Sequence, residues 1–587
     1  MTDWLHPGLL FVVGALVIPL LKGRLLQGWL LLVPLLAIAD VAALSPGNFG
    51  SFEFIGVHLV IGKVDKLSLV FAWVFTIAAF IGCLYGLHVR SAAQHVATFL
   101  YVGSALGVVF AGDWFTLLVS WEIMAFASAY LIFATRLGPA VRAGMRYLMV
   151  HITGGVLLFG GIVLHGLETG SFLFGPLENS GGLAYTLILV SFMLNAAVPP
   201  LNAWLTDAYP EATVTGAVFL SAFTTKTAVY VLIRAYPGTE VLIWLGAAMA
   251  LYGVIYAVLE NDCRRLLAYH IVSQVGYMVA GVGIGTEMAL NGSASHAFAH
   301  IIYKGLLFMG AGAVIHMTGR RKLTELGGLY RTMPWTVALY MIGAFAISAF
   351  PFFSGFVSKS MVIAAAAGDH HATVVLMLTI ASSGTFLHTG LKLPYYMFFG
   401  KDCGLRPEEP PLNMLLAMGI AAILCIGIGV LPGVLYELLP YPVDYEPYTG
   451  AHITASLGIL MFTALGFFLF LKFLDPERTI SLDTDWVYRR GVRVFLWVAE
   501  KPVARWEAAV SALSDTVILR SLHATARESL KVDLNIVDAV VNGVARTALI
   551  TGAIARRMQT GVVTHYAGAM IGGVLACVAL YVLLSFG

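Results

Sequence analysis

Three ionisable side chains recur at a spacing of four within one apolar stretch, "HAFAHIIYKGLLF" (296–308). On an α-helix His296, His300 and Lys304 would lie along one face, about 12 Å from first to last at about 1.5 Å per residue. Histidine titrates near neutral pH, and a lysine in a low-dielectric setting gives up its proton more readily, so this ladder is typical of a proton relay. Gaps of about 6 Å are too long for direct hydrogen bonds, which predicts that ordered water completes the relay.

Further ionisable residues interrupt other apolar stretches of the sequence. They are Glu122, His151, Lys226, Lys359, His388 and Lys392. An ionisable side chain inside the hydrocarbon core is costly, and such residues usually mark ion pathways or proton relays. A polar contact between two helices would explain any one of them, but the whole set favours a path for protons or other cations.

The composition indicates the medium that surrounds these residues. Of 587 residues, 59% are hydrophobic and 11% are charged, which is typical of a multi-span membrane protein in contact with the lipid bilayer. A net charge of +2 gives no sign of a nucleic-acid partner. The five cysteines form no C-x-x-C pair, and no phosphate-binding loop or dinucleotide fingerprint occurs. We therefore expect no cofactor, no metal and no catalytic redox residue in this chain.

Apolar runs long enough to cross a bilayer recur along the whole chain. We count about sixteen runs of roughly 20 residues, which predicts an all-α polytopic membrane protein with about 16 transmembrane helices. Lysine and arginine gather in alternate loops, such as 22–24 and 320–331. By the positive-inside rule these loops lie inside, and both chain termini lie outside.

Two of the predicted spans contain helix-breaking sequences. The seventh runs into "AVPPLNAWLTDAYPEA", and the twelfth contains "SAFPFFSGFVSK", where Pro351 and Gly355 interrupt a stretch too long for one straight helix. Broken helices at membrane depth line polar cavities and often mark an ion path, although a packing kink would explain either one alone. Because each break falls late in a block of about five spans, we expect inverted repeats.

The segment 483–566 mixes charged with apolar residues at helical spacing, as in Val537, Val541 and Val544 beside Arg546. This pattern predicts a long amphipathic lateral helix that lies along the membrane, with a last span to anchor it. We therefore divide the chain into N-terminal spans with an extracytoplasmic loop, an ion-translocating core, peripheral spans, the lateral helix and a C-terminal anchoring span. Their ranges are 1–94, 95–400, 401–482, 483–566 and 567–587.

Six motifs occur in a fixed order. They are "SWEIM", "PPLNAWLTDAYPEA", "TTKTAVYVLIR", "DCRRLLAYHIVSQVGYM", "HAFAHIIYKGLLFMGAG" and "FSGFVSK". Over roughly residues 60 to 400 this series resembles the antiporter-like subunits shared by respiratory complex I, membrane-bound hydrogenases and Mrp-type Na⁺/H⁺ antiporters. The C-terminal "VDAVVNGVARTA" and "RRMQTGVVTHYAG" are similar to the distal subunit of complex I, which carries a lateral helix.

The resemblance implies a role for each residue that matches a family motif. Glu122 would be the acidic half of a Glu–Lys pair and Lys226 the central lysine of the eighth span. The ladder at 296–304 would bridge the two halves of the core, and Lys359 would be the exit-side residue of the broken twelfth span. The family places these groups along a hydrated axis at mid-membrane depth.

The sequence departs from the family at the seventh-span lysine, whose position is occupied by Asn195. No lysine occurs between Arg146 and Lys226, so a shifted alignment cannot restore it, and asparagine does not titrate. His151 of the sixth span is a candidate replacement. A second departure is His270, where the family usually has a small residue. Auxiliary candidates are His151, Asn195, His270, His388 and Lys392.

These observations predict a proton-translocating antiporter-like subunit, or one that exchanges Na⁺ for H⁺, in a multisubunit membrane complex with other integral membrane subunits. The chain would not be an enzyme by itself, and its location would be a bacterial or archaeal cytoplasmic (inner) membrane. One alternative is a transport-inactive structural subunit that clamps a complex, which the loss of the lysine at Asn195 favours. Another is the proton-path subunit of an inorganic-carbon uptake complex.

Overall fold

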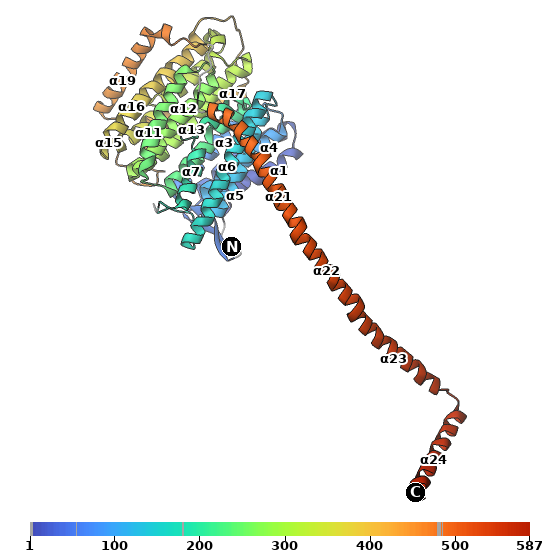
Figure 1. Ribbon diagram of the computed structural model, residues 1–587. Coiled ribbons are helices and arrows are strands. Elements are labelled where there is room, and N and C mark those ends of the chain that lie inside the picture. Colours follow the sequence, from blue (N-terminus) through green and yellow to red (C-terminus); the bar gives the residue numbers. More distant parts are fainter. Residues whose placement is uncertain (1–3, 55, 179–180, 478–482, 484, 587) are drawn as a thin grey trace. The chain divides into compact units, whose positions relative to one another are not determined.

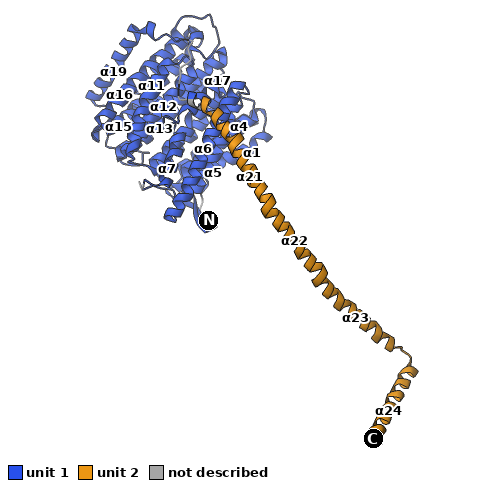
Figure 2. Cartoon of the chain, in the orientation of Figure 1, with its two compact units in different colours: residues 1–486 blue, residues 487–587 orange. Residues whose placement is uncertain are grey.

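The computed structural model describes residues 4–54, 56–178, 181–477, 483 and 485–586. The chain divides into two compact units, residues 1–486 and 487–587 (Figures 1 and 2). The first unit holds all the ionisable residues singled out above. Each unit is described by itself.

The first unit begins with six long helices and one β-hairpin. The helices are α1 (Pro7–Val17), α2 (Gly23–Ala43), α3 (Lys66–Tyr85), α4 (Ala92–Phe110), α5 (Trp114–Phe133) and α6 (Gly138–Thr169). The hairpin between α2 and α3 pairs β1 (Gly47–Phe54) with β2 (Val57–Val64) in antiparallel register, Gly47 opposite Val64. Asp65 caps α3 by accepting a hydrogen bond from the Ser68 amide, while the Ser68 hydroxyl accepts from the Asp65 amide.

The remainder of the first unit contains the core helices and the peripheral ones. They are α7 (Leu183–Asn195), α8 (Ala203–Ala208), α9 (Val214–Ala222), α10 (Thr224–Ala235), α11 (Glu240–Leu259), α12 (Cys263–Ile284), α13 (Glu287–Thr318), α14 (Pro334–Ile347), α15 (Ser354–Gly368), α16 (Ala372–Thr385), α17 (Leu412–Val430), α18 (Pro432–Tyr436) and α19 (Gly450–Leu469). The apolar lengths of α9, α10 and α12 are wholly buried and that of α13 nearly so, whereas α19 lies at the periphery. The most buried helices therefore carry Lys226 and the ladder.

The expected membrane spans coincide with helices. Within the described chain, fourteen helices are long and apolar enough to cross a membrane, and one of these is the segment Arg493–Met558. Three shorter apolar helices, Pro7–Leu20, Leu183–Asn195 and Pro334–Ile347, occupy the remaining predicted spans. The all-α polytopic fold is confirmed.

Both predicted helix breaks are present. After α7 the chain turns through residues 196–202, which include a cis Pro199–Pro200 bond, before α8 begins. Between α14 and α15 the break contains Ala349 and Phe352, both in the left-handed region with φ of 56° and 72°. The next span in each case is also irregular, because Phe223 separates α9 from α10 and a π-helical segment, Phe386–Lys392, follows α16. This recurrence supports a repeat, and its inversion stays a prediction.

The second unit is almost entirely helical. The helices α20 (Asp485–Val498), α21 (Ala504–Leu513), α22 (Arg520–Val532) and α23 (Asp538–Met558) join through π-helical turns at 499–503, 514–519 and 533–537. The resulting helix includes the 66 residues Arg493–Met558, which extend about 100 Å at about 1.5 Å per residue. A last apolar helix, α24 (Val563–Phe586), follows. The expected long lateral helix is confirmed, whereas the five-part division of the chain stays a prediction.

Candidate ion-translocation site

Lys226 lies at a helix discontinuity in the middle of the first unit. Its ammonium donates hydrogen bonds to the backbone carbonyl of Ser221 at 2.6 Å and to Oγ1 of Thr225 at 3.0 Å. The break at Phe223 brings this carbonyl to the side chain, because Ser221 lies at the end of α9 while Lys226 lies in the first turn of α10. Lys226 is fully buried.

Lys359 repeats this arrangement at the broken twelfth span. Its Nζ donates to the carbonyl of Ile347, the last residue of α14, at 2.8 Å. It also lies 5.3 Å from the ring centroid of Tyr277. At both helix breaks, a buried lysine therefore donates a hydrogen bond to a backbone carbonyl.

The ladder on α13 joins these two lysines. Nδ1 of His296 lies 3.2 Å from Oγ of Ser358, which directly precedes Lys359, and the rings of His296 and His300 are 6.2 Å apart. Lys226 lies close enough to both His300 and Lys304 for their charges to interact. Along α13 the ladder thus runs from Lys304 through His300 to His296, which lies beside the residue that precedes Lys359.

Several ladder atoms have no protein partner within the described chain. They are both ring nitrogens of His300 and Nζ of Lys304. Buried polar groups in native proteins nearly always hydrogen-bond to protein or to ordered water. The predicted hydration of the ladder therefore has a structural basis in these atoms.

Glu122 on α5 and Asn195 on α7 each lie beside a glycine of α6. A Cβ added to Gly155 of α6 would lie 1.6 Å from Oε1 of Glu122, and one added to Gly154 would lie 3.6 Å from Oδ1 of Asn195. The adjacent glycines of α6 thus lie against the two side chains, Gly155 against Glu122 and Gly154 near Asn195. Glu122 borders an open, mainly apolar groove of about 1030 Å³ that is also lined by residues of α4 and by Pro19.

His151 contacts Trp204, which is hydrogen-bonded to the residue before Asn195. The His151 ring stacks on Tyr147 at 4.0 Å and meets Trp204 edge-on at 4.5 Å, and Trp204 Nε1 donates to the carbonyl of Leu194 at 2.9 Å. His151 Nε2 and both amide atoms of Asn195 have no hydrogen-bond partner among the described residues. The two auxiliary candidates therefore present unpartnered polar atoms in the same buried region.

A cluster of hydroxyl groups lies between this region and Lys226. Tyr147 and Ser128 share a hydrogen bond of 2.8 Å. Tyr101 and Thr224 share one of 2.6 Å, and Thr224 is followed directly by Thr225, which accepts from Lys226. Sequence reasoning missed these residues because tyrosine, serine and threonine are common in apolar helices and carry no distinctive spacing.

The remaining auxiliary candidates lie together on α12 and in the π-helical segment Phe386–Lys392. The rings of His270 on α12 and His388 in the π-helical segment are 5.9 Å apart. Lys392, one turn beyond His388, donates to the carbonyl of Val258 at the end of α11. The structure thus brings His270, His388 and Lys392 into one group.

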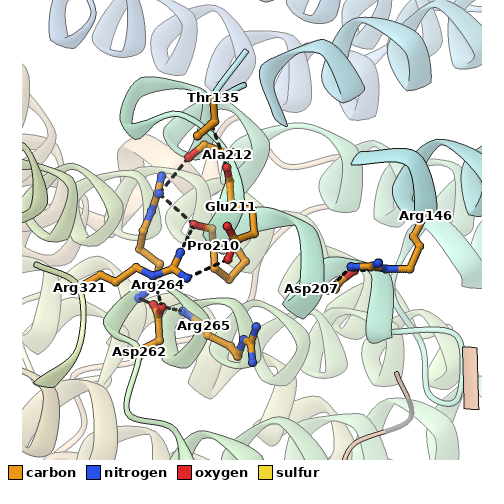
Figure 3. Close-up of polar contacts among 10 residues, drawn as sticks. All are labelled: Thr135, Arg146, Asp207, Pro210, Glu211, Ala212, Asp262, Arg264, Arg265 and Arg321. Atoms are coloured by element: carbon orange, nitrogen blue, oxygen red, sulfur yellow. Dashed lines mark hydrogen bonds and ion pairs between the residues drawn. The ribbon is translucent and has the colours of Figure 1, made fainter. Parts of the chain in front are cut away.

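The acidic residues of the "DAYPEA" motif serve the fold. Arg146 holds Asp207 through two hydrogen bonds of 2.7 and 2.9 Å, and Arg321 pairs with both Glu211 and Asp262 at 2.9 Å (Figure 3). Burial opposes the charge of Arg321, but these two carboxylates raise its pKa. These pairs neutralise the two acidic side chains of this loop.

The family "NADH:quinone oxidoreductase/Mrp antiporter, TM" matches residues 111–385. A probable K(+)/H(+) antiporter subunit of Rhizobium meliloti is 30% identical over 402 residues, which are 62% of this chain and 40% of that protein. The match therefore spans less than half the length of that relative.

Two further proteins extend the comparison. A Na(+)/H(+) antiporter subunit of Alkalihalophilus pseudofirmus is 30% identical over 358 residues, which are 55% of this chain and 72% of that protein. A chain of the archaeal membrane-bound sulfane sulfur reductase, a respiratory membrane complex, has the same fold with a TM-score of 0.69 at 22% identity, covering 98% of this chain and 99% of its own. With these matches added to the helix breaks and the buried lysines, the chain belongs to the NADH:quinone oxidoreductase/Mrp antiporter family of membrane proteins.

Proposed function

We propose that this chain translocates protons across the membrane as an antiporter-like subunit of a larger complex. Protons would move between Lys226 and Lys359 through the ladder of Lys304, His300 and His296. The observation that carries the proposal is that all five residues of this series are buried within one unit.

The three axial lysines have no neutralising carboxylate. Lys226 and Lys359 donate to backbone carbonyls, Lys304 has no protein partner, and no ion pair reaches any of them in the described residues. A buried lysine kept only for structure is normally paired, because an uncompensated charge is costly to bury. A lysine without a counter-charge exchanges its proton readily when a neighbouring charge moves.

The same surroundings favour H⁺ over Na⁺ along the axis. Ammonium groups repel a metal cation, and a hard cation needs several oxygen ligands. Among the described residues, no group of three or more His, Cys, Asp or Glu side chains could hold a metal ion. A proton needs only alternating donors and acceptors, which lysine and histidine provide.

A cavity lined by several polar side chains supports Lys359 as the outlet. It has a volume of about 170 Å³ and is lined by Lys359, Ser348, Ser360, Thr379, Ser382, Ser383 and His452, among others. A water molecule needs only about 10–15 Å³ of such volume, so several waters fit. His452 lies in the first turn of α19, at the end of this helix predicted to face outside.

The setting of this activity is a further part of the proposal. The relatives' names describe antiporter subunits, and the structural neighbour is part of a respiratory complex, so we infer other integral membrane subunits as partners and a bacterial or archaeal cytoplasmic membrane as the location. Asn195 favours one competing function, a subunit that has lost transport and acts as a structural clamp.

Proton flux in proteoliposomes, with the complex purified through this chain, separates the two functions. Lys226→Ala and Lys359→Ala should each reduce flux at least tenfold, whereas Lys401→Ala, in an exposed loop, should leave it unchanged. If both core variants assemble and transport like the unmodified complex, the chain is a structural clamp and the proposal is overturned.

A further inference from the structure

Two buried histidines, His270 and His388, are not used by the translocation axis described above. His270 and His388 are buried on α12 and in the π-helical segment, and no protein atom among the described residues hydrogen-bonds to any of their four ring nitrogens. A core histidine retained for packing normally has at least one nitrogen satisfied. Two adjacent rings with none indicate a polar site that holds ordered water.

These rings continue the axis away from the ladder. Lys304 lies close enough to His270 for their charges to interact, and His388 has the same relation to Lys392. The rings themselves are 5.9 Å apart, a gap that one water molecule bridges. The series Lys304, His270, His388, Lys392 therefore joins neighbouring groups, with ordered water needed to complete the gap between the rings.

Lys392 brings this series to the inner face. Its Nζ donates to Val258, beside the loop that begins at Glu260. That loop pairs with the arginine-rich segment after α13, since Asp262 forms a backbone bridge with Lys322, and the positive-inside rule places this segment inside.

Two carboxylates lie near Lys392, at the inner end of the series. Lys392 interacts electrostatically with both Glu260 and Asp475. Glu260 is buried, whereas Asp475 is exposed and accepts a hydrogen bond of 2.7 Å from the Tyr396 hydroxyl. The exposed carboxylate can take protons from solvent and pass them toward Lys392.

We infer that His270, His388 and Lys392 form a second proton route, which connects Lys304 to the inner face at Glu260 and Asp475. The inference rests on the proposed proton translocation. It explains how protons reach the ladder although Asn195 on α7 occupies the position of a lysine. A proton bound by the unprotonated nitrogen of a neutral histidine releases the one on its other nitrogen, so each ring returns to neutral after the transfer. The π-helical turn also fits this role, because such turns are frequent at functional sites.

The test uses the purified complex in proteoliposomes. His388→Gln and His270→Gln keep a side chain that forms hydrogen bonds but does not titrate, and Lys392→Arg keeps a charge that cannot be lost. Each should reduce proton flux at least tenfold, whereas His370→Gln, at an exposed turn, should have no effect.

The outcomes separate this inference from the function on which it rests. If Lys359→Ala abolishes flux while all three route variants transport normally, protons do not use this route and the inference is overturned. If Lys359→Ala is also without effect, the proposed function fails as well.

Should the histidine variants fail to assemble, a cryo-EM map of the unmodified complex that resolves waters provides the second measurement. We expect waters within hydrogen-bonding distance of His270 and His388 and onward to Lys392. A dry, closely packed space between the rings would refute the route.

Discussion

The adjacent glycines of α6 allow a sharp test of Glu122. An alanine at Gly155 would place its Cβ 1.6 Å from Oε1 of Glu122, which is about 1.8 Å short of the 3.4 Å at which ordinary contact begins. The carboxyl group is the end of a flexible side chain beside an open groove, so it can swing away. We expect Gly155→Ala to fold normally while displacing Glu122 by about 2 Å.

Gly154→Ala is the matched control. Its Cβ would lie 3.4 Å from Leu194 and 3.6 Å from Asn195, which are ordinary contacts, and both alanines add the same helix propensity of up to about 1 kcal/mol. If the position of Glu122 matters, Gly155→Ala should lower proton flux in proteoliposomes at least tenfold, because misplacement by about 1 Å is known to cost up to about a hundredfold in enzymes. Equal flux for the two variants would refute a role for Glu122 at this position.

Three further predictions concern stability and assembly. Asn195→Leu removes two buried amide atoms without protein partners and should stabilise the complex by about 1 kcal/mol in a thermal unfolding assay; a loss of stability would mean that the amide has a partner in the assembled complex. Asp207→Asn breaks the two-bond contact with Arg146 and should cost about 2 kcal/mol, less than a fully buried pair because Arg146 is partly exposed; an unchanged melting temperature would contradict this. Truncation after Trp486 should leave the first unit folded but reduce co-purification of other subunits, and unchanged co-purification would remove the clamp role of the lateral helix.

Features that depend on local geometry could be predicted from the sequence. The spacing of His296, His300 and Lys304 fixes a common helix face, whatever the surrounding fold. The proline and glycine near 351–355 predict the break that brings Ile347 to Lys359. Membrane spans follow from the need to cover about 30 Å of hydrocarbon, which leaves a clear apolar signal.

Features that depend on contacts between distant helices could not be predicted from the sequence. The break at Phe223 has no proline or glycine to mark it, and the π-helical segment at 386–392 reads as ordinary helix. Nothing in the seventh span predicts that two adjacent glycines of α6 lie beside Glu122 and Asn195, because this depends on how distant helices pack. The group of His270, His388 and Lys392 likewise combines helices distant in sequence.

The central claim is that axial lysines carry protons by losing and regaining them. Lys226→Arg tests it most directly, because arginine preserves the positive charge but does not deprotonate in proteins. In proteoliposomes that contain the whole complex, we predict normal assembly with proton flux at least tenfold lower than that of the Lys401→Ala control. Normal flux with arginine at position 226 would show that only the charge is needed, and would contradict the claim.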